Sequence, residues 1–456
     1  MKKIFIFAFC IILILTSCTT DKKEVNSKSS ESKEVTIAVW EDDYDFTIDL
    51  SMPIIEYISK YNKDNDTRVK FDKIKGNTYE EFLDNLNVKL YLDEGPTLIY
   101  ISNMPYFYQL FKEKGIAEKV DTDTIPNLNN VYDFYLEDEI YFIPIGADYT
   151  CKSFNKEQIE KLDIPYPDYD WTIEDYYEIR NKWVDYTKPI EFSRDDIQDI
   201  IIYKLDNIDV FSQDNKKINL DTKQMKENIN NMREEIYSDK YILPENFTYE
   251  DYYNACFDYH SFNKGRDFLT RSATIYYLTF DAYNALNVES LKRGMMDDRI
   301  HFPNVNNQKY NIDLGGFIVN SNGKNKKLGY EFINSLLSKE FQMQMYKGEK
   351  QDYVLPSNMY SPVLKTLKDN IQNIESKKNL QPEVIKIKNY IYDKLKKGEI
   401  KPEIYRKDKT LKTVTLRRKL YKDLFKFIFT EDVFSDDSLS RELKELEDRY
   451  SIYLNE

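Results

Sequence analysis

Val35-Thr36-Ile37-Ala38-Val39-Trp40 is a run of β-branched and apolar residues that stops at the acidic cluster Glu41-Asp42-Asp43. Such a run predicts a buried strand that ends at a polar loop. Two further strand-like runs follow, Val69 to Ile74 and Thr97 to Ile101, and the segments between them carry apolar residues at helical spacing. The order strand, helix, strand, helix, strand predicts a parallel sheet with crossover helices. In such a sheet the ligand site lies outside the carboxyl ends of the strands.

Four residues stand just after these strand ends and are our candidates for ligand binding in this part of the chain. Trp40 and Asp42 follow the first strand, and Met104 and Tyr106 follow the third. Aromatic rings can serve as flat platforms for a ligand, and a carboxylate accepts hydrogen bonds from a ligand's donor groups. The alternatives are ordinary: Trp40 as a core ring, Asp42 as a solvated loop acid and Met104 as packing material.

The N-terminus has the layout of a secretory signal. Two lysines precede an apolar run from Ile4 to Leu15, which is too short to remain as a membrane-spanning helix. The next residues complete Leu15-Thr16-Ser17-Cys18, which resembles the bacterial lipobox, and this resemblance implies that Cys18 is acylated and anchors the protein to the cell membrane, outside the cytoplasm. The alternative is an ordinary signal peptide with a chance cysteine. We assign residues 1–17 to the signal peptide.

Composition bounds the rest of the chain. Residues 18–34 hold the lipidated cysteine and are dominated by Lys, Ser, Glu and Asp, so they are expected to form a flexible tether. Residues 35–456 exceed what one hydrophobic core usually serves, which predicts two lobes. The formal net charge of −14 argues against nucleic acid or anionic lipid as a partner of the folded body.

Landmarks along the remaining sequence describe a second region. A short strand is expected over Ile140 to Gly146, and a linking strand then leaves the first lobe. Thr172 with Asp175 has the spacing of a helix start. The run Leu314-Gly315-Gly316-Phe317 predicts a strand whose glycines let a ligand or a neighbouring backbone come close.

Several segments, in their order along the chain, resemble those of extracellular solute-binding lipoproteins of ABC importers. They are of the large two-lobed, sugar-binding type to which the maltose-binding protein belongs. The segments are Phe154-Asn155-Lys156, Trp171 to Tyr176, Phe262 to Gly265, Asn320 to Lys327 with the helix that follows, and Tyr453 to Glu456.

This resemblance implies an α/β fold of the type II periplasmic-binding-protein kind, in which each lobe is a sheet flanked by helices and a hinge joins the lobes. It places residues 35–147 with about 285–345 in the first lobe, and about 148–284 with about 346–456 in the second. Tyr149, Trp171 and Tyr276 are then the expected ligand-binding residues of the second lobe, by the resemblance and by their aromatic type.

The resemblance also implies a function. The protein is expected to be a monomer without a cofactor that captures a small solute, foremost a mono- or oligosaccharide, by hinge closure, and delivers it to the transmembrane subunits of an ABC permease.

Catalytic and metal residues are not predicted. Only His260 and His301 occur, HExxH and GxSxG spacings are absent, and the two cysteines of the body, Cys151 and Cys256, cannot complete a zinc site. Whether those cysteines are bridged stays open. The alternatives are a lipid-anchored glycoside hydrolase with paired carboxylates, or a surface sensor or adhesin that uses the same fold.

Overall fold

The computed structural model describes residues 33–455 apart from short gaps. The gaps are residues 42–47, 77–78, 93–94, 103, 207, 209, 213–216, 258–278, 285–298, 304–309, 348–360, 377–381, 408 and 431–433.

The first part of the chain folds as the sequence predicts. β1 (Glu34–Trp40), β2 (Arg68–Ile74) and β3 (Leu98–Ser102) alternate with α3 (Ile48–Asn65) and α4 (Tyr79–Leu90). β1 lies in the middle and pairs in parallel with both β2 and β3. The expectation of a parallel sheet with crossover helices is therefore confirmed for these three strands.

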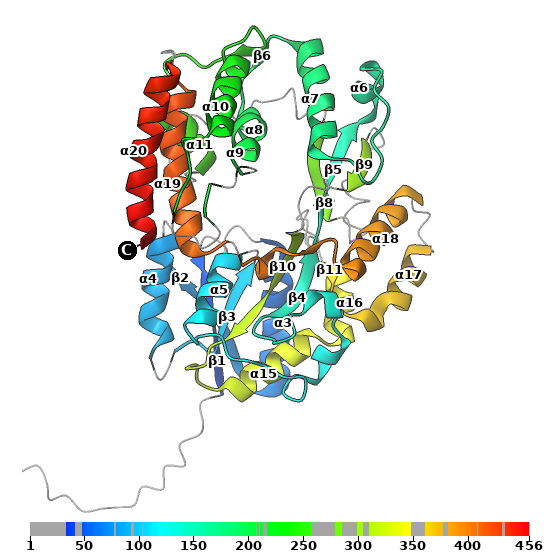
Figure 1. The fold of residues 1–456 in the computed structure, drawn as a ribbon. Coiled ribbons are helices and arrows are strands. Elements are labelled where there is room, and N and C mark those ends of the chain that lie inside the picture. Colours follow the sequence, from blue (N-terminus) through cyan, green and yellow to red (C-terminus); the bar gives the residue numbers. More distant parts are fainter. Residues whose placement is uncertain are drawn as a thin grey trace, which may run out of the picture.

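Later segments extend this sheet to seven strands. β10 (Tyr310–Val319) runs antiparallel between β3 and β4 (Ile143–Asp148), β11 (Ser361–Pro362) pairs with β4, and β12 (Lys401–Pro402) pairs with β10. Around the sheet lie α5 (Pro105–Glu113), α15 (Lys326–Leu336), α16 (Lys339–Lys347), α17 (Lys368–Ser376) and α18 (Pro382–Lys397), with the 3-10 turns η1 (Pro126–Asn130), η2 (Asp133–Tyr135), η4 (Lys365–Leu367) and η5 (Glu403–Tyr405) (Figure 1). We call this assembly the first body.

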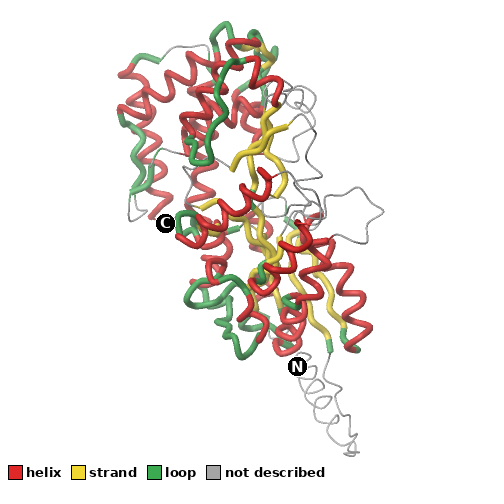
Figure 2. The backbone as a smooth tube through the Cα atoms, turned by 90° about the vertical axis from the view of Figure 1, so that its right-hand side faces the viewer, coloured by secondary structure: helices red, strands yellow, loops and turns green. Residues whose placement is uncertain are grey.

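A second body consists of a smaller sheet and a larger group of helices. β5 (Thr150–Asn155) lies between β8 (Thr279–Asn284) and β9 (Arg299–Pro303), and β6 (Ile190–Glu191) pairs with β7 (Tyr241–Ile242). Its helices are α6 (Lys156–Lys161), α7 (Ile173–Thr187), α8 (Arg194–Ile197), α9 (Tyr203–Asp206), α10 (Lys223–Ile236), α11 (Tyr249–Phe257), α19 (Leu411–Ile428) and α20 (Asp436–Asn455). Figure 2 shows the strands of the two sheets following one another along the molecule, with this helical part beyond them.

Buried apolar side chains form three separate clusters. The first core surrounds the seven-stranded sheet, the second core lies among the helices of the second body, and a small third core gathers around Phe154, Trp171 and Phe302 beside β5 and β9. None of the helices within the described ranges is both long and apolar enough to cross a membrane.

The packing differs from the expected division of the chain in two places. Residues 361–405 were expected in the second lobe, but Val363, Ile391 and Ile404 belong to the first core and β11 and β12 join the first sheet. β9 was expected in the first lobe, but it pairs with β5. β11 and β12 could not be predicted because strands of two residues show no periodicity in the sequence. β9 could not be placed because the partner of a strand is set by the fit of the two strands and not by their order in the chain.

The close approach of β10 to β4 requires glycine at position 316. A Cβ atom at this position would lie 2.1 Å from the carbonyl oxygen of Ile143 and 2.8 Å from the ring of Phe142. Only a residue without a side chain lets the two backbones approach this closely. The expectation that a neighbouring backbone comes close here is confirmed for Gly316.

Candidate functional site

The carboxyl ends of β1 and β3 carry a connected row of aromatic rings. Trp40 is half-buried, its indole N–H donates to the carbonyl oxygen of Gly76 at 2.9 Å, and its ring stacks on Phe82 at a centroid distance of 5.5 Å. Phe82 contacts Phe107 at 5.2 Å, and Phe107 contacts Tyr106 at 4.8 Å. The structure therefore places two predicted residues, Trp40 and Tyr106, at the two ends of one row of rings.

Met104 and Tyr106 are held by the start of α5. Met104 is the residue before the helix, Pro105 opens it, and both Met104 and Tyr106 are 7% exposed and belong to the first core. Pro suits this position because its fixed φ and missing N–H cost nothing in the first turn. Both residues are thus mostly covered, in contrast to Trp40. Two other predicted residues, Asp42 and Tyr276, lie outside the described residues.

The chain crosses from the first body to the second at Tyr149. β4 ends at Asp148 and β5 begins at Thr150, so that Tyr149 is the only residue between two strands of different sheets. Its side chain is 2% exposed and packs in the first core. The predicted residue Tyr149 is therefore a buried residue of the crossing.

Two acidic residues are paired in register at this crossing. Asp148 on β4 is directly opposite Asp313 on β10, and opposite residues of antiparallel strands place their side chains on the same face. Burial raises the pKa of Asp313 to about 7, the negative charge of Glu403 adds to the shift, and the positive charge of Lys409 opposes it. Asp148 was not among the predicted site residues, although it follows a predicted strand in the manner of Asp42.

Glu403 is a third acid near this place, and it lies shortly before α19, where the chain passes again from the first body to the second. It is 8% exposed on η5, and its carboxylate accepts from the Lys409 Nζ at 2.6 Å and lies 3.6 Å from the Arg406 guanidinium. Both cations lie between η5 and α19. The crossing region therefore combines three acids with two cations, all near the edge of the first body that joins the second.

Trp171 lies in the third core, and the residue that it bonds, Pro303, is paired with Cys151 near the start of β5. It is 2% exposed, its indole N–H donates to the carbonyl oxygen of Pro303 at 2.8 Å, and its ring packs edge-on against Phe154 at 5.6 Å. The expected helix start beside it is confirmed, because Thr172 and Asp175 form a reciprocal capping box at the start of α7. In this position Trp171 anchors α7 to the sheet of the second body.

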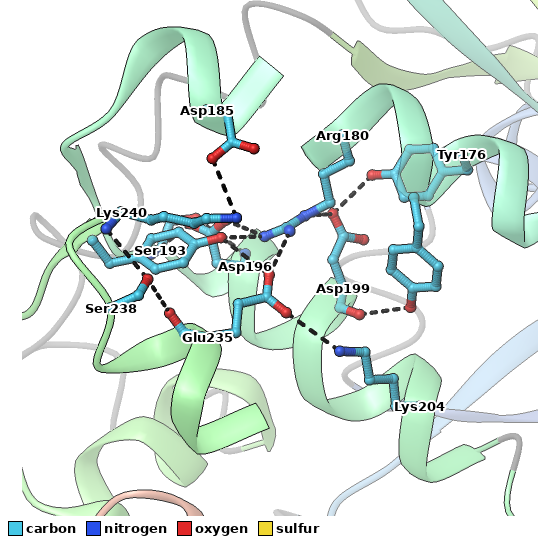
Figure 3. Close-up of polar contacts among 12 residues, drawn as sticks. Tyr176, Arg180, Asp185, Ser193, Asp196, Asp199, Lys204, Glu235, Ser238 and Lys240 are labelled. Atoms are coloured by element: carbon cyan, nitrogen blue, oxygen red, sulfur yellow. Dashed lines mark hydrogen bonds and ion pairs between the residues drawn. The ribbon is translucent and has the colours of Figure 1, made fainter. Parts of the chain in front are cut away.

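A buried ionic cluster holds the helices of the second body together (Figure 3). Arg180 on α7 is 1% exposed, and its guanidinium contacts Asp196 at 2.8 Å, Glu235 at 3.0 Å and Asp199 at 3.3 Å. The Nη2 atom also donates to the Tyr241 hydroxyl at 2.9 Å. The three acids come from α8, the π-helical segment Gln198–Ile202 and α10, so one cation ties four helical segments together.

The rest of this cluster neutralises and positions its acids. The Tyr176 hydroxyl donates to Asp199 Oδ2 at 2.8 Å, and Lys204 Nζ lies 3.3 Å from Glu235. Burial raises the pKa of Asp196 to about 6, although the charge of Arg180 acts in the opposite direction. Each carboxylate is engaged by a cation, so we interpret the cluster as a scaffold. The cluster was not predicted from the sequence, in which the Ser193–Asp196 capping box is its local signal.

No cluster of three or more His, Cys, Asp or Glu side chains is arranged to hold a metal ion within the described part of the chain. Cys151, which is buried in β5, and Cys256, which is on α11, are not joined to each other.

A family model and several solved structures of known proteins match this chain. The family model described as bacterial extracellular solute-binding protein matches residues 49–343. A search of curated protein sequences finds no match.

Solved structures share the fold at low identity. An ABC transporter solute-binding protein from Thermotoga lettingae, bound with α-D-tagatose, is 12% identical with a TM-score of 0.54 and covers 93% of this chain and 100% of its own. The sugar-binding protein MalE from Xanthomonas citri is 12% identical with a TM-score of 0.55, covering 92% and 97%. A solute-binding protein from Agrobacterium radiobacter, in complex with ribitol, is 11% identical with a TM-score of 0.55, covering 92% and 99%.

The Arg180 cluster predicts a large loss of stability when its cation is removed. Arg180→Met leaves the buried acids Asp196 and Asp199 and the half-buried Glu235 without their central partner, which is expected to lower the free energy of unfolding by about 3–5 kcal/mol in urea denaturation. Lys182→Met on the same helix is the matched control, because the Lys182 side chain is 47% exposed and pairs only with Glu178 at 3.1 Å. Equal losses in the two variants would contradict a scaffold role for Arg180.

Asp313 predicts a pH-dependent stability. Its carboxyl keeps a proton up to about pH 7 in the folded protein, whereas an unfolded Asp loses it near pH 3.9. The resulting stabilisation is present at low pH and is lost as the pH rises toward 7, by at most about 1.4 kcal/mol per pH unit. We expect Asp313→Asn, which cannot titrate, to gain stability relative to the wild type between pH 4.5 and 8.

Urea denaturation at several pH values measures this difference. Asp239→Asn is the control, at a carboxyl whose side chain is 81% exposed. If the stability of the wild type and of Asp313→Asn changed in parallel with pH, the raised pKa of Asp313 would be contradicted.

Proposed function

Since the chain belongs to the family of bacterial extracellular solute-binding proteins, we propose that it is the lipid-anchored binding component of an ABC importer and that it captures a mono- or oligosaccharide. The observation that carries the proposal is the division into two bodies with separate cores, joined where β4 passes into β5. A solute that contacts both bodies binds their closed arrangement best and shifts the equilibrium toward it. The permease then recognises the closed arrangement of the two bodies, which forms when solute is bound.

The edge of the first body supports the choice of a carbohydrate. Trp40 offers a half-buried ring at the end of β1, and Asp148 offers a carboxyl group at the end of β4. Rings and carboxylates are the groups that suit the apolar faces and hydroxyl groups of a sugar. The structures that share the fold include proteins bound with tagatose and ribitol, which are both polyhydroxylated.

The proposed ligand contacts follow from where the predicted residues lie. Trp40 and Asp148 would contact the solute, with Met104, Tyr106 and Tyr149 supporting them from the first core. Asp42 and Tyr276 remain proposed contacts outside the described residues. Trp171 would act by fixing α7, because its ring and its N–H are both engaged in the second body. We propose that the protein works as a monomer and catalyses no reaction.

Binding is tested by the melting temperature of the purified protein in the presence of mono- and oligosaccharides. A sugar at about 100 times its dissociation constant adds about 2.7 kcal/mol to the stability and raises the melting temperature. Trp40→Ala is expected to reduce that rise, whereas Tyr186→Ala, at a ring that is 61% exposed on α7, leaves it unchanged. Peptides or polyamines that raise the melting temperature when no sugar does would contradict the carbohydrate class, and sugar turnover would contradict the absence of catalysis.

The lipid anchor is tested in cells that express the full chain. The sequence predicts acylation of Cys18, so the wild-type protein should stay in the membrane fraction and incorporate labelled fatty acid. Cys18→Ala is expected to lose both properties, whereas Cys10→Ala, which lies within the signal peptide, is expected to keep them. A Cys18→Ala protein that remains in the membrane fraction would refute the anchor.

A further inference from the structure

A loop of the second body rests on a helix of the first. Tyr169 and Asp170 precede Trp171, whose ring is part of the third core. The Tyr169 ring packs against both the first core and the third core. Its neighbours are Tyr390 on α18, at a centroid distance of 5.5 Å and an angle of 74°, and Phe302 on β9, at 6.5 Å. Tyr169 is therefore an apolar bridge between the two bodies.

Asp170 adds a polar bridge at the same place. Its Oδ1 atom accepts a hydrogen bond from the Tyr390 hydroxyl at 2.7 Å and lies 2.9 Å from Lys394 Nζ. Lys394 also pairs with Glu399 at 2.6 Å. Glu399 therefore helps to hold the cation on the first body, where it contacts Asp170 of the second body. In addition, Lys386 Nζ lies 4.9 Å from the centre of the Tyr169 ring.

These contacts are separate from the points where the backbone passes between the bodies. α18 contributes Ile387, Ile391 and Leu395 to the first core, which fixes it to the seven-stranded sheet. It also lies beside β9, a strand of the second body (Figure 1). The contact thus joins the two bodies through side chains alone, and side-chain contacts can break without unfolding either core.

We propose that Tyr169 and Asp170 form a latch with α18 that holds the two bodies in one relative arrangement and is released when Asp170 separates from Lys394 and Tyr390. The side chain of Asp170 is 64% exposed and that of Lys394 is 20% exposed. Salt therefore weakens the ionic part of the latch, because mobile ions screen exposed charges. The latch concerns the arrangement of the bodies and does not depend on which solute the protein binds.

Two variants separate the latch from the local structure of α18. Asp170→Asn removes the charge that faces Lys394 from the second body. Glu399→Gln is the matched control, because it removes the other partner of Lys394, which belongs to the first body. Circular dichroism and the melting temperature establish that both variants are folded.

The measurements are small-angle X-ray scattering and hydrogen exchange on the purified protein without solute. At about 0.05 M salt, where screening is weak, Asp170→Asn is expected to show a broader distance distribution than the wild type, and about fivefold faster exchange at residues 169–172. The wild type should approach this behaviour at about 1 M salt, where screening is strong. Glu399→Gln should resemble the wild type.

Two results would overturn the latch. One is identical scattering and exchange for Asp170→Asn and the wild type at low salt. The other is an equal change in Glu399→Gln, which would place the effect in α18 itself rather than between the bodies.

Discussion

A single buried residue, Tyr149, connects two strands that belong to different sheets, and this short connection constrains the whole molecule. β4 is held between β10 and β11, and β5 is held between β8 and β9. Because both strands are fixed by their own ladders, a change in the relative position of the bodies requires the backbone to bend near Tyr149. The Tyr149 ring is 2% exposed in the first core, so the bending point stays attached to the first body.

A second connection limits the movement further. α19 begins with Leu411 and Val414, which pack against the first core, and continues with Leu416, Leu420 and Leu424, which belong to the second core. A rigid helix that starts on one body and is buried in the other transmits rotation of either one. The acids and cations around Glu403 lie just before this helix. Asp313 is paired with Asp148 beside the first connection, and the charge of Glu403, beside the second, adds to the rise in its pKa.

The sequence predicts the parts whose signals are local. β1, α3, β2, α4 and β3 follow from periodicity, and the start of α7 follows from Thr172 and Asp175. Residues 361–405 could not be assigned to the correct body, because β11 and β12 are two residues long. The role of Trp171 as an anchor depends on Pro303, and the Arg180 cluster depends on Asp196, Asp199 and Glu235. Such partners are set by tertiary packing, which no short segment encodes.

The central claim is that a solute binds between two bodies that move about Tyr149 as rigid units. It is tested most directly by a crystal structure with the carbohydrate that stabilises the protein most. The account predicts a sugar in contact with Trp40 or Asp148 of the first body and with residues of the second, and first and second cores whose internal packing is unchanged. A sugar that contacts only one body, or that lies away from the ends of β1 and β4, would contradict it.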